Sequence, residues 1–121
     1  MRLSLFVVAG SALGGLARFW LGLWALSVWG ATFPWGTLLI NVLGSVVIGA
    51  AATALPLHAT DGRAFLMVGI CGGFTTFSSY SLQSLELLHA DRVAAALAYM
   101  ASSVVLCLAA TAIGWSLGKL V

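Results

Sequence analysis

Polar side chains recur at every fourth position inside a long apolar segment of the chain. They are Thr37, Asn41 and Ser45, and this spacing places them on one face of an α-helix. Amide and hydroxyl groups donate hydrogen bonds without carrying charge, so they can replace water around a small ion. Single hydroxyls in membrane helices, however, often bond their own backbone or a neighbouring helix. The stripe is therefore compatible with a polar path or with helix packing.

Two later segments carry polar side chains of the same kinds. One has Tyr99, Ser103, Cys107 and Thr111, again four residues apart. The segment before it contains Thr76, Phe77, Ser79, Tyr80 and Gln83. Three coincident sets favour a shared site over separate local contacts, because a buried Asn and a buried Gln both add groups that need hydrogen-bond partners.

The run from Gly69 to Ser81, GICGGFTTFSSYS, is unfavourable for a continuous membrane helix. Gly costs about 1 kcal/mol relative to Ala inside a helix, and Ser and Thr offer the backbone competing partners. We expect a helix that breaks near Gly72-Gly73 and resumes around Thr76. Freed backbone groups are tolerated in hydrocarbon only against protein, water or an ion, so the break predicts a site.

Composition indicates an integral membrane protein. Of the 121 residues, 62% are hydrophobic and 7% are charged, against about 25% charged residues in soluble domains. A membrane-spanning helix needs about 20 apolar residues. The sequence predicts one all-α transmembrane domain over residues 1–121, with four helices at about 3–29, 35–57, 64–89 and 93–117. Gly-x-x-x-Gly pairs at Gly10/Gly14 and Gly114/Gly118 suit close helix packing in lipid, and no basic cluster favours nucleic acid.

The spans contain few charged residues, and these limit the kinds of substrate and reaction that the protein can serve. They are Arg18 in the first span and Glu86 near the end of the third. Without an acid near the membrane centre, neither a proton relay nor a site for cationic substrates is expected. No His/Cys cluster has metal-ligand spacing, and no nucleophile–base–acid set is visible, so an enzyme is not expected. Amides, hydroxyls and positive aromatic edges instead favour a small anion.

Loop charges give almost no signal for membrane orientation. With four spans, one side carries Arg2, Arg63 and Lys119, and the other carries Arg92, joined by Arg18 if its side chain extends that way. Three against two is nearly no bias under the positive-inside rule. Two interpretations stay open: another feature sets one orientation, or the chain inserts both ways and pairs as an antiparallel dimer. A four-helix chain has little room to enclose a pathway alone, which favours an oligomer.

Three motifs together resemble the CrcB/Fluc family of fluoride channels. They are Gly14-x-x-x-Arg18, Pro34-Trp35-Gly36-Thr37-Leu38-x-x-Asn41-x-x-Gly44 and Gly72-Gly73-Phe74-Thr75-Thr76-Phe77-Ser78. The last motif is highly specific, and the resemblance covers essentially the whole chain. It implies an antiparallel, dual-topology homodimer in the bacterial inner membrane, with two pores that export fluoride from the cytoplasm.

The resemblance also implies roles for single residues. It matches Asn41, Phe77 and Ser103 to the pore, where Tyr80 occupies the position of a second phenylalanine and the hydroxyls of Thr37 and Thr76 lie on the polar stripes. It matches Arg18 to an arginine that attracts anions near the pore entrance.

The resemblance further implies a structural Na⁺ at the dimer centre, on the backbone carbonyls of Gly72 and Thr75. Three positions depart from the family pattern: Tyr80 replaces a phenylalanine, Gln83 replaces a frequent glutamate and Cys107 replaces a frequent serine. Each departure keeps the approximate size of the side chain and changes its polarity, so we expect it to affect the conduction rate and the path of the ion.

Two other functions remain as alternatives. A small multidrug-type exporter has a similar size and dual topology, but it needs a carboxylate in the first span, where this chain has Arg18 and no acid. A non-conducting membrane subunit would explain the Gly-x-x-x-Gly surfaces and would leave the polar stripes and the break unexplained. Fluoride is small and strongly hydrated, so a selective pore must offer close donors in a narrow space. The choice of fluoride over another small anion comes from the resemblance alone.

Overall fold

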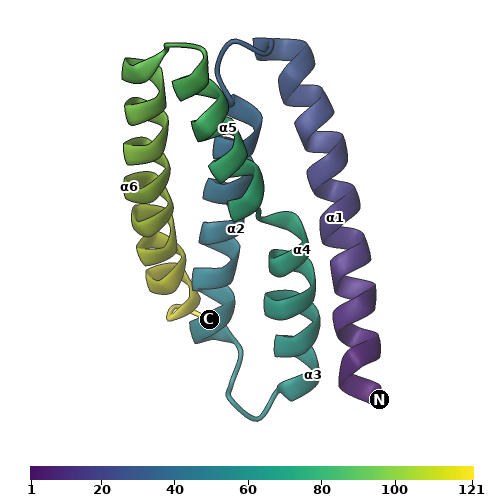
Figure 1. Cartoon of the computed structure of the whole chain (residues 1–121). Helices are drawn as coiled ribbons and strands as arrows, with labels where there is room; N and C mark the ends of the chain where they lie inside the picture. Colours follow the sequence, from purple (N-terminus) through teal and green to yellow (C-terminus); the bar gives the residue numbers. More distant parts are fainter.

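The computed structural model describes all 121 residues, from Met1 to Val121, as helices joined by short loops (Figure 1). The elements are α1 (Arg2–Trp29), α2 (Trp35–Ala54), α3 (Thr60–Arg63), a π-helical segment (Ala64–Cys71), α4 (Gly72–Phe74), α5 (Phe77–His89) and α6 (Val93–Gly118). Four helical stretches are long and apolar enough to cross a membrane: α1, α2, Thr60–His89 and α6. The expectation of an all-α chain with four spans is confirmed. The second stretch ends at Ala54, because Leu55 is extended (ψ 119°) ahead of Pro56.

Two helix pairs carry most of the packing: α2 with α6, and α1 with the π-helical segment. Glycines let the backbones approach closely in both pairs. A Cβ atom added at Gly69 would lie 2.8 Å from the Cα of Gly10, and one added at Gly114 would lie 3.0 Å from the amide nitrogen of Ala50. Helix association in lipid depends on this close van der Waals contact. The Gly-x-x-x-Gly pairs of α1 and α6 therefore lie in helix contacts.

Helical geometry stops at Thr75 and Thr76, between α4 and α5 (Figure 1). Thr75 has φ −79° and ψ 157°, and Thr76 has φ −150° and ψ 113°. Gly72 and Gly73, where the sequence placed the break, are helical instead, with φ −63° and ψ −37° at Gly72. The reason is packing: a Cβ atom at Gly73 would lie 2.6 Å from the carbonyl oxygen of Ser11, so this glycine is needed for contact with α1.

Both ends of the bundle are held by charged side chains. At the end that carries the two termini in Figure 1, Arg2 pairs with Asp61, and Arg63 Nη1 donates to the carbonyl of Leu55 at 2.8 Å. The Arg63 contact satisfies a free carbonyl at the end of α2. At the other end, Arg92 donates to the carbonyl of Thr32.

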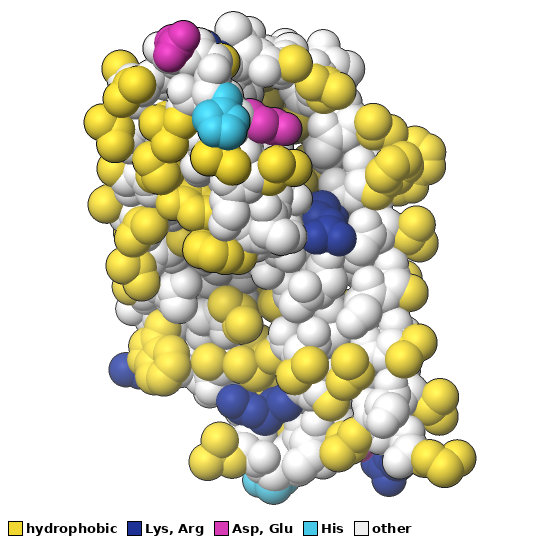
Figure 2. Space-filling model, viewed as in Figure 1, with side chains coloured by type: hydrophobic (Ala, Val, Ile, Leu, Met, Phe, Trp, Pro, Cys, Tyr) yellow, Lys and Arg dark blue, Asp and Glu magenta, His cyan; other side chains and the backbone are white.

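Apolar side chains cover much of the visible outer surface (Figure 2). Among the large ones, Leu5, Trp20, Val105 and Leu108 are each more than 60% exposed. A lipid-facing surface accounts for this pattern, because hydrocarbon is as favourable for these side chains as a protein core. The buried polar side chains, between the helices, are those of Thr37, Thr76, Ser84 and Ser103.

Candidate functional site

A cavity of about 410 Å³ lies beside the extended residues Thr75 and Thr76. Its lining comes from α2, the π-helical segment, α5 and α6. It includes six of the predicted site residues: Asn41, Thr75, Thr76, Phe77, Tyr80 and Ser103. The lining contains no carboxylate. A second cavity of about 360 Å³ contains Arg18, Thr37, Thr76, Ser79 and Gln83. Thr76 therefore lines both cavities.

Asn41 reaches from α2 to the backbone of Thr76. Its Oδ1 accepts a hydrogen bond from the Thr76 amide at 2.8 Å, and its Nδ2 donates to the Thr76 carbonyl at 3.1 Å. The sequence analysis expected the buried amide to need partners, and Thr76 supplies them. One hydrogen on Nδ2 remains uncommitted within the chain, because an amide carries two donors.

These contacts change the hydrogen bonding of the neighbouring backbone carbonyls. In a continuous helix, the amide of Thr76 would donate to Gly72 and the amide of Ser79 would donate to Thr75. Instead, Thr76 donates to Asn41, and Ser79 donates to the Thr76 hydroxyl at 3.1 Å. The carbonyls of Gly72 and Thr75 thus lose their helical partners. No group of three or more His, Cys, Asp or Glu residues could hold a metal ion. A cation at this place would rest on backbone oxygens, which fits the donor set of these two residues.

Aromatic rings extend the site from Phe77 toward α6. The rings of Phe77 and Tyr80 lie 5.2 Å apart, and those of Tyr80 and Tyr99 lie 5.4 Å apart. Phe77 is 78% exposed, so its ring is available to a molecule outside this chain. Tyr99 is completely buried and donates from its hydroxyl to Gln83 Oε1 at 2.9 Å.

Tyr99 was not among the predicted pore residues, although it precedes Ser103 by one helical turn on the same polar stripe. That spacing was the available signal. Its hydrogen bond to Gln83 orients the side chain that departs from the family's frequent glutamate. Tyr80 and Cys107, the other two departures from the family pattern, both line the first cavity, and Cys107 carries a free thiol.

Ser103 presents a hydroxyl without a partner. Its side chain is 6% exposed, and its buried Oγ makes no hydrogen bond within the chain. Serines in helices usually bond a backbone carbonyl three or four residues earlier, as neighbouring Ser102 does with Tyr99. A buried polar group without a partner is costly, and the Ser103 hydroxyl beside the cavity is therefore a donor that the chain itself leaves unused.

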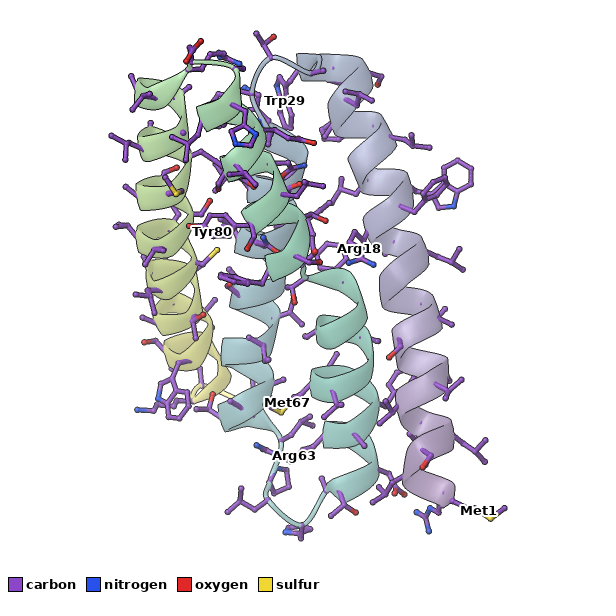
Figure 3. The ribbon with its side chains drawn as sticks, in the orientation of Figure 1. Met1, Arg18, Trp29, Arg63, Met67 and Tyr80 are labelled. Atoms are coloured by element: carbon purple, nitrogen blue, oxygen red, sulfur yellow. The ribbon has the colours of Figure 1, made fainter.

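Arg18 is partly buried in the first span and points toward the space between α1 and α5 (Figure 3). The only ion pair of the chain joins Arg2 to Asp61, so no carboxylate neutralises Arg18. A positive charge inside a membrane-spanning region raises the local concentration of anions. The second cavity is therefore electropositive and contains hydroxyl and amide donors.

Comparison with known proteins settles the family. A sequence profile described as CrcB-like protein, Camphor Resistance (CrcB), matches residues 5–115. The chain belongs to the CrcB family. The resemblance inferred from the three motifs is confirmed, and this CrcB chain is a multi-pass membrane protein.

Relatives of this CrcB chain share the same name, Fluoride-specific ion channel FluC. The protein of Rhodospirillum rubrum is 50% identical over 112 residues, which cover 86% of this chain and 84% of the relative. The protein of Methylocella silvestris is 46% identical over 115 residues, covering 91% and 88%. The protein of Hahella chejuensis is 41% identical over 119 residues, covering 96% and 94%.

Proposed function

We propose that this protein is a fluoride-selective ion channel of the bacterial inner membrane, through which fluoride leaves the cytoplasm. The names of its relatives support fluoride as the ion. The observation that carries the proposal is the 410 Å³ cavity, where Asn41, Ser103 and the rings of Phe77 and Tyr80 meet without a carboxylate. A proton-coupled exporter of cationic drugs would need such a carboxylate.

The cavity offers replacements for the water around fluoride. Ser103 contributes an uncommitted hydroxyl, and Asn41 contributes the remaining hydrogen of its amide. The edges of the Phe77 and Tyr80 rings carry partial positive charge and can face an anion directly. Arg18 attracts anions into the neighbouring cavity. Hydrogen fluoride crosses membranes as a neutral acid and ionises inside the cell, so a passive channel suffices for export.

The cavity also needs a cover. Phe77 is 78% exposed and borders polar residues in the middle of a span, and polar groups facing hydrocarbon are costly. We infer that a second copy packs over this face in the opposite orientation, giving an antiparallel, dual-topology homodimer with two pores. Only four basic residues lie in the loops and at the termini, three at one end and Arg92 at the other, so the loops specify a single orientation only weakly.

In the same arrangement, a Na⁺ ion lies at the dimer centre. The carbonyls of Gly72 and Thr75, which have lost their helical hydrogen-bond partners, would hold it, with both copies contributing. Unwound backbone in membrane proteins coordinates Na⁺ in this way. The stretch Thr60–His89 then crosses the membrane once, as two half-helices that meet at the ion. When bound, the ion supplies fixed positive charge between the two pores.

The test is anion flux from liposomes that contain only this protein. Fluoride-loaded liposomes should release fluoride when valinomycin supplies a K⁺ counter-flux, whereas chloride-loaded liposomes should not release chloride. Protein-free liposomes are the control. Equal fluoride and chloride release would contradict the selectivity, and absence of release from folded protein would favour a non-conducting subunit.

A further inference from the structure

The amide hydrogen of Thr76 has two possible acceptors. In an unbroken helix it would bond the carbonyl of Gly72, four residues earlier. In this structure it bonds Asn41 Oδ1 at 2.8 Å, and Asn41 Nδ2 returns a bond to the Thr76 carbonyl at 3.1 Å. One side chain of α2 thus takes both backbone hydrogen bonds of a residue 35 positions away.

We propose that Asn41 is a positioning residue that maintains the interruption of the third span by diverting the Thr76 amide from Gly72. In this role Asn41 connects the two sites: its side chain borders the anion cavity, and its hydrogen bond to Thr76 frees a carbonyl for the cation. The link to the cation rests on the proposed function, whereas the effect of Asn41 on the backbone of Thr76 is independent of that proposal.

Two neighbouring contacts fit this role. The Thr76 hydroxyl accepts from the amide of Ser79 at 3.1 Å and so begins α5. Gly44, on α2 close to Asn41, leaves the space that the methyl group of Thr75 fills, since a Cβ atom at Gly44 would collide with it. Two positions on neighbouring turns of α2 therefore contact the extended residues: Asn41 bonds Thr76, and Gly44 leaves space for Thr75.

The experiment measures the backbone directly. In isotope-labelled protein in micelles, the ¹³Cα and ¹³Cβ chemical shifts of Thr75 and Thr76 distinguish extended from helical conformation without any flux measurement. Asn41→Leu keeps a similar volume and removes both hydrogen bonds, so the Thr76 shifts should move to helical values. Ser45→Ala, one turn further along α2, removes a hydroxyl without a bond to Thr76, so both threonines should keep extended shifts.

Asn41→Asp supplies a second test that does not depend on the folding of Asn41→Leu. A carboxyl group accepts from the Thr76 amide in either protonation state, and the ionised form accepts more strongly. Thr76 should therefore stay extended in Asn41→Asp, because its amide remains diverted from Gly72.

The outcomes separate this inference from the proposed function. Extended shifts in folded Asn41→Leu, or helical shifts at Thr76 in folded Asn41→Asp, would overturn the positioning role. Addition of Na⁺ should move the ¹³C shift of the Gly72 carbonyl in the unmodified protein and not in Asn41→Leu. If the unmodified protein shows no Na⁺ response or no fluoride flux while the threonine shifts change as expected, the cation or channel proposal fails and the positioning role stands.

Discussion

At the scale of single residues, the hydrogen-bond donors around the cavity differ in how far the chain itself uses them. Asn41 gives one amide hydrogen to Thr76, and the hydroxyl of Tyr99 is taken by Gln83. Ser103 has no partner at all. A donor that is free before the ligand arrives can give its full hydrogen bond to that ligand. Ser103 is therefore the most sensitive position at which to separate an anion contact from a structural contact.

Replacing Ser103 with alanine should reduce fluoride flux without destabilising the protein. A hydrogen bond to a charged group contributes about 1.5–3 kcal/mol, which corresponds to a loss of flux of about tenfold to hundredfold. No hydrogen bond within the chain is lost. Ser102→Ala is the matched control, because its hydroxyl bonds the backbone of Tyr99. Liposome flux and thermal unfolding test the pair, and unchanged flux in folded Ser103→Ala would exclude a contact with the ion.

Phe77→Ile should abolish most fluoride flux and leave the chain folded. Isoleucine keeps apolar bulk but lacks the positive ring edge, and Phe77 is 78% exposed, so little of the chain's own packing is lost. Tyr80→Phe keeps the ring between Phe77 and Tyr99 and removes only the hydroxyl. One neutral hydrogen bond contributes about 1 kcal/mol, so the flux should stay within about fivefold of the unmodified protein. Flux and dimer yield are measured together. An assembled Phe77→Ile dimer with normal flux would remove the aromatic edge from the mechanism.

At the scale of the elements, the two adjacent glycines of the third span differ in function. A Cβ atom at Gly73 would lie 2.6 Å from the carbonyl oxygen and 2.9 Å from the Cα of Ser11, whereas one at Gly72 would meet no atom of this chain within 4 Å. Gly73 therefore serves the packing of α4 against α1. Gly72 is free within the chain and is open to contact with a partner.

Gly73→Ala should lower the thermal stability of the detergent-solubilised protein, because α1 must move away; overpacking of this kind costs about 1–3 kcal/mol. Gly72→Ala should leave the fold of each chain intact and act only on dimer assembly, since alanine favours the helix by about 1 kcal/mol. Thermal unfolding and cross-linking of both variants distinguish these effects. Equal loss of fold stability in the two would contradict the assignment of roles.

The same two glycines explain where prediction from the sequence succeeds and where it stops. Apolar length predicted four spans, and four-residue spacing placed Thr37 and Asn41 on one helix face. A glycine can permit an unusual backbone conformation, or it can let a neighbouring helix pack closely, and its sequence context alone does not distinguish the two uses. The extended residues are accordingly Thr75 and Thr76. The pairing of Asn41 with a backbone 35 residues away depends on how α2 and α5 align, which local spacing does not encode.

At the scale of the whole molecule, the two ends of the bundle carry separate sets of loops. The termini and the loop before α3 lie at one end, and the loops after α1 and α5 lie at the other (Figure 1). Both ends carry arginines that bond within the chain: Arg2 and Arg63 at the first, Arg92 at the second. With Lys119, the first end has three basic residues and the second has one. Because basic loop residues set orientation, this small difference leaves the direction of insertion sensitive to a few added charges.

With Lys119→Gln at the other end, lysines added at Ala31 and Ala90 give three basic loop residues against two, and should drive copies toward one orientation and abolish flux when this variant is expressed alone. Both residues are exposed in loops at the same end, so the fold should tolerate the change, and copies that all insert the same way cannot form an antiparallel dimer. Lysines at Leu57 and His58, which are exposed at the opposite end, should fix the other orientation with the same loss. Co-expression of the two variants should restore fluoride flux, because each then supplies the partner that the other lacks. Labelling of accessible termini reports the orientation independently. A single orientation in the unmodified protein, or full flux from either lysine variant alone, would show that the working assembly is not an antiparallel pair.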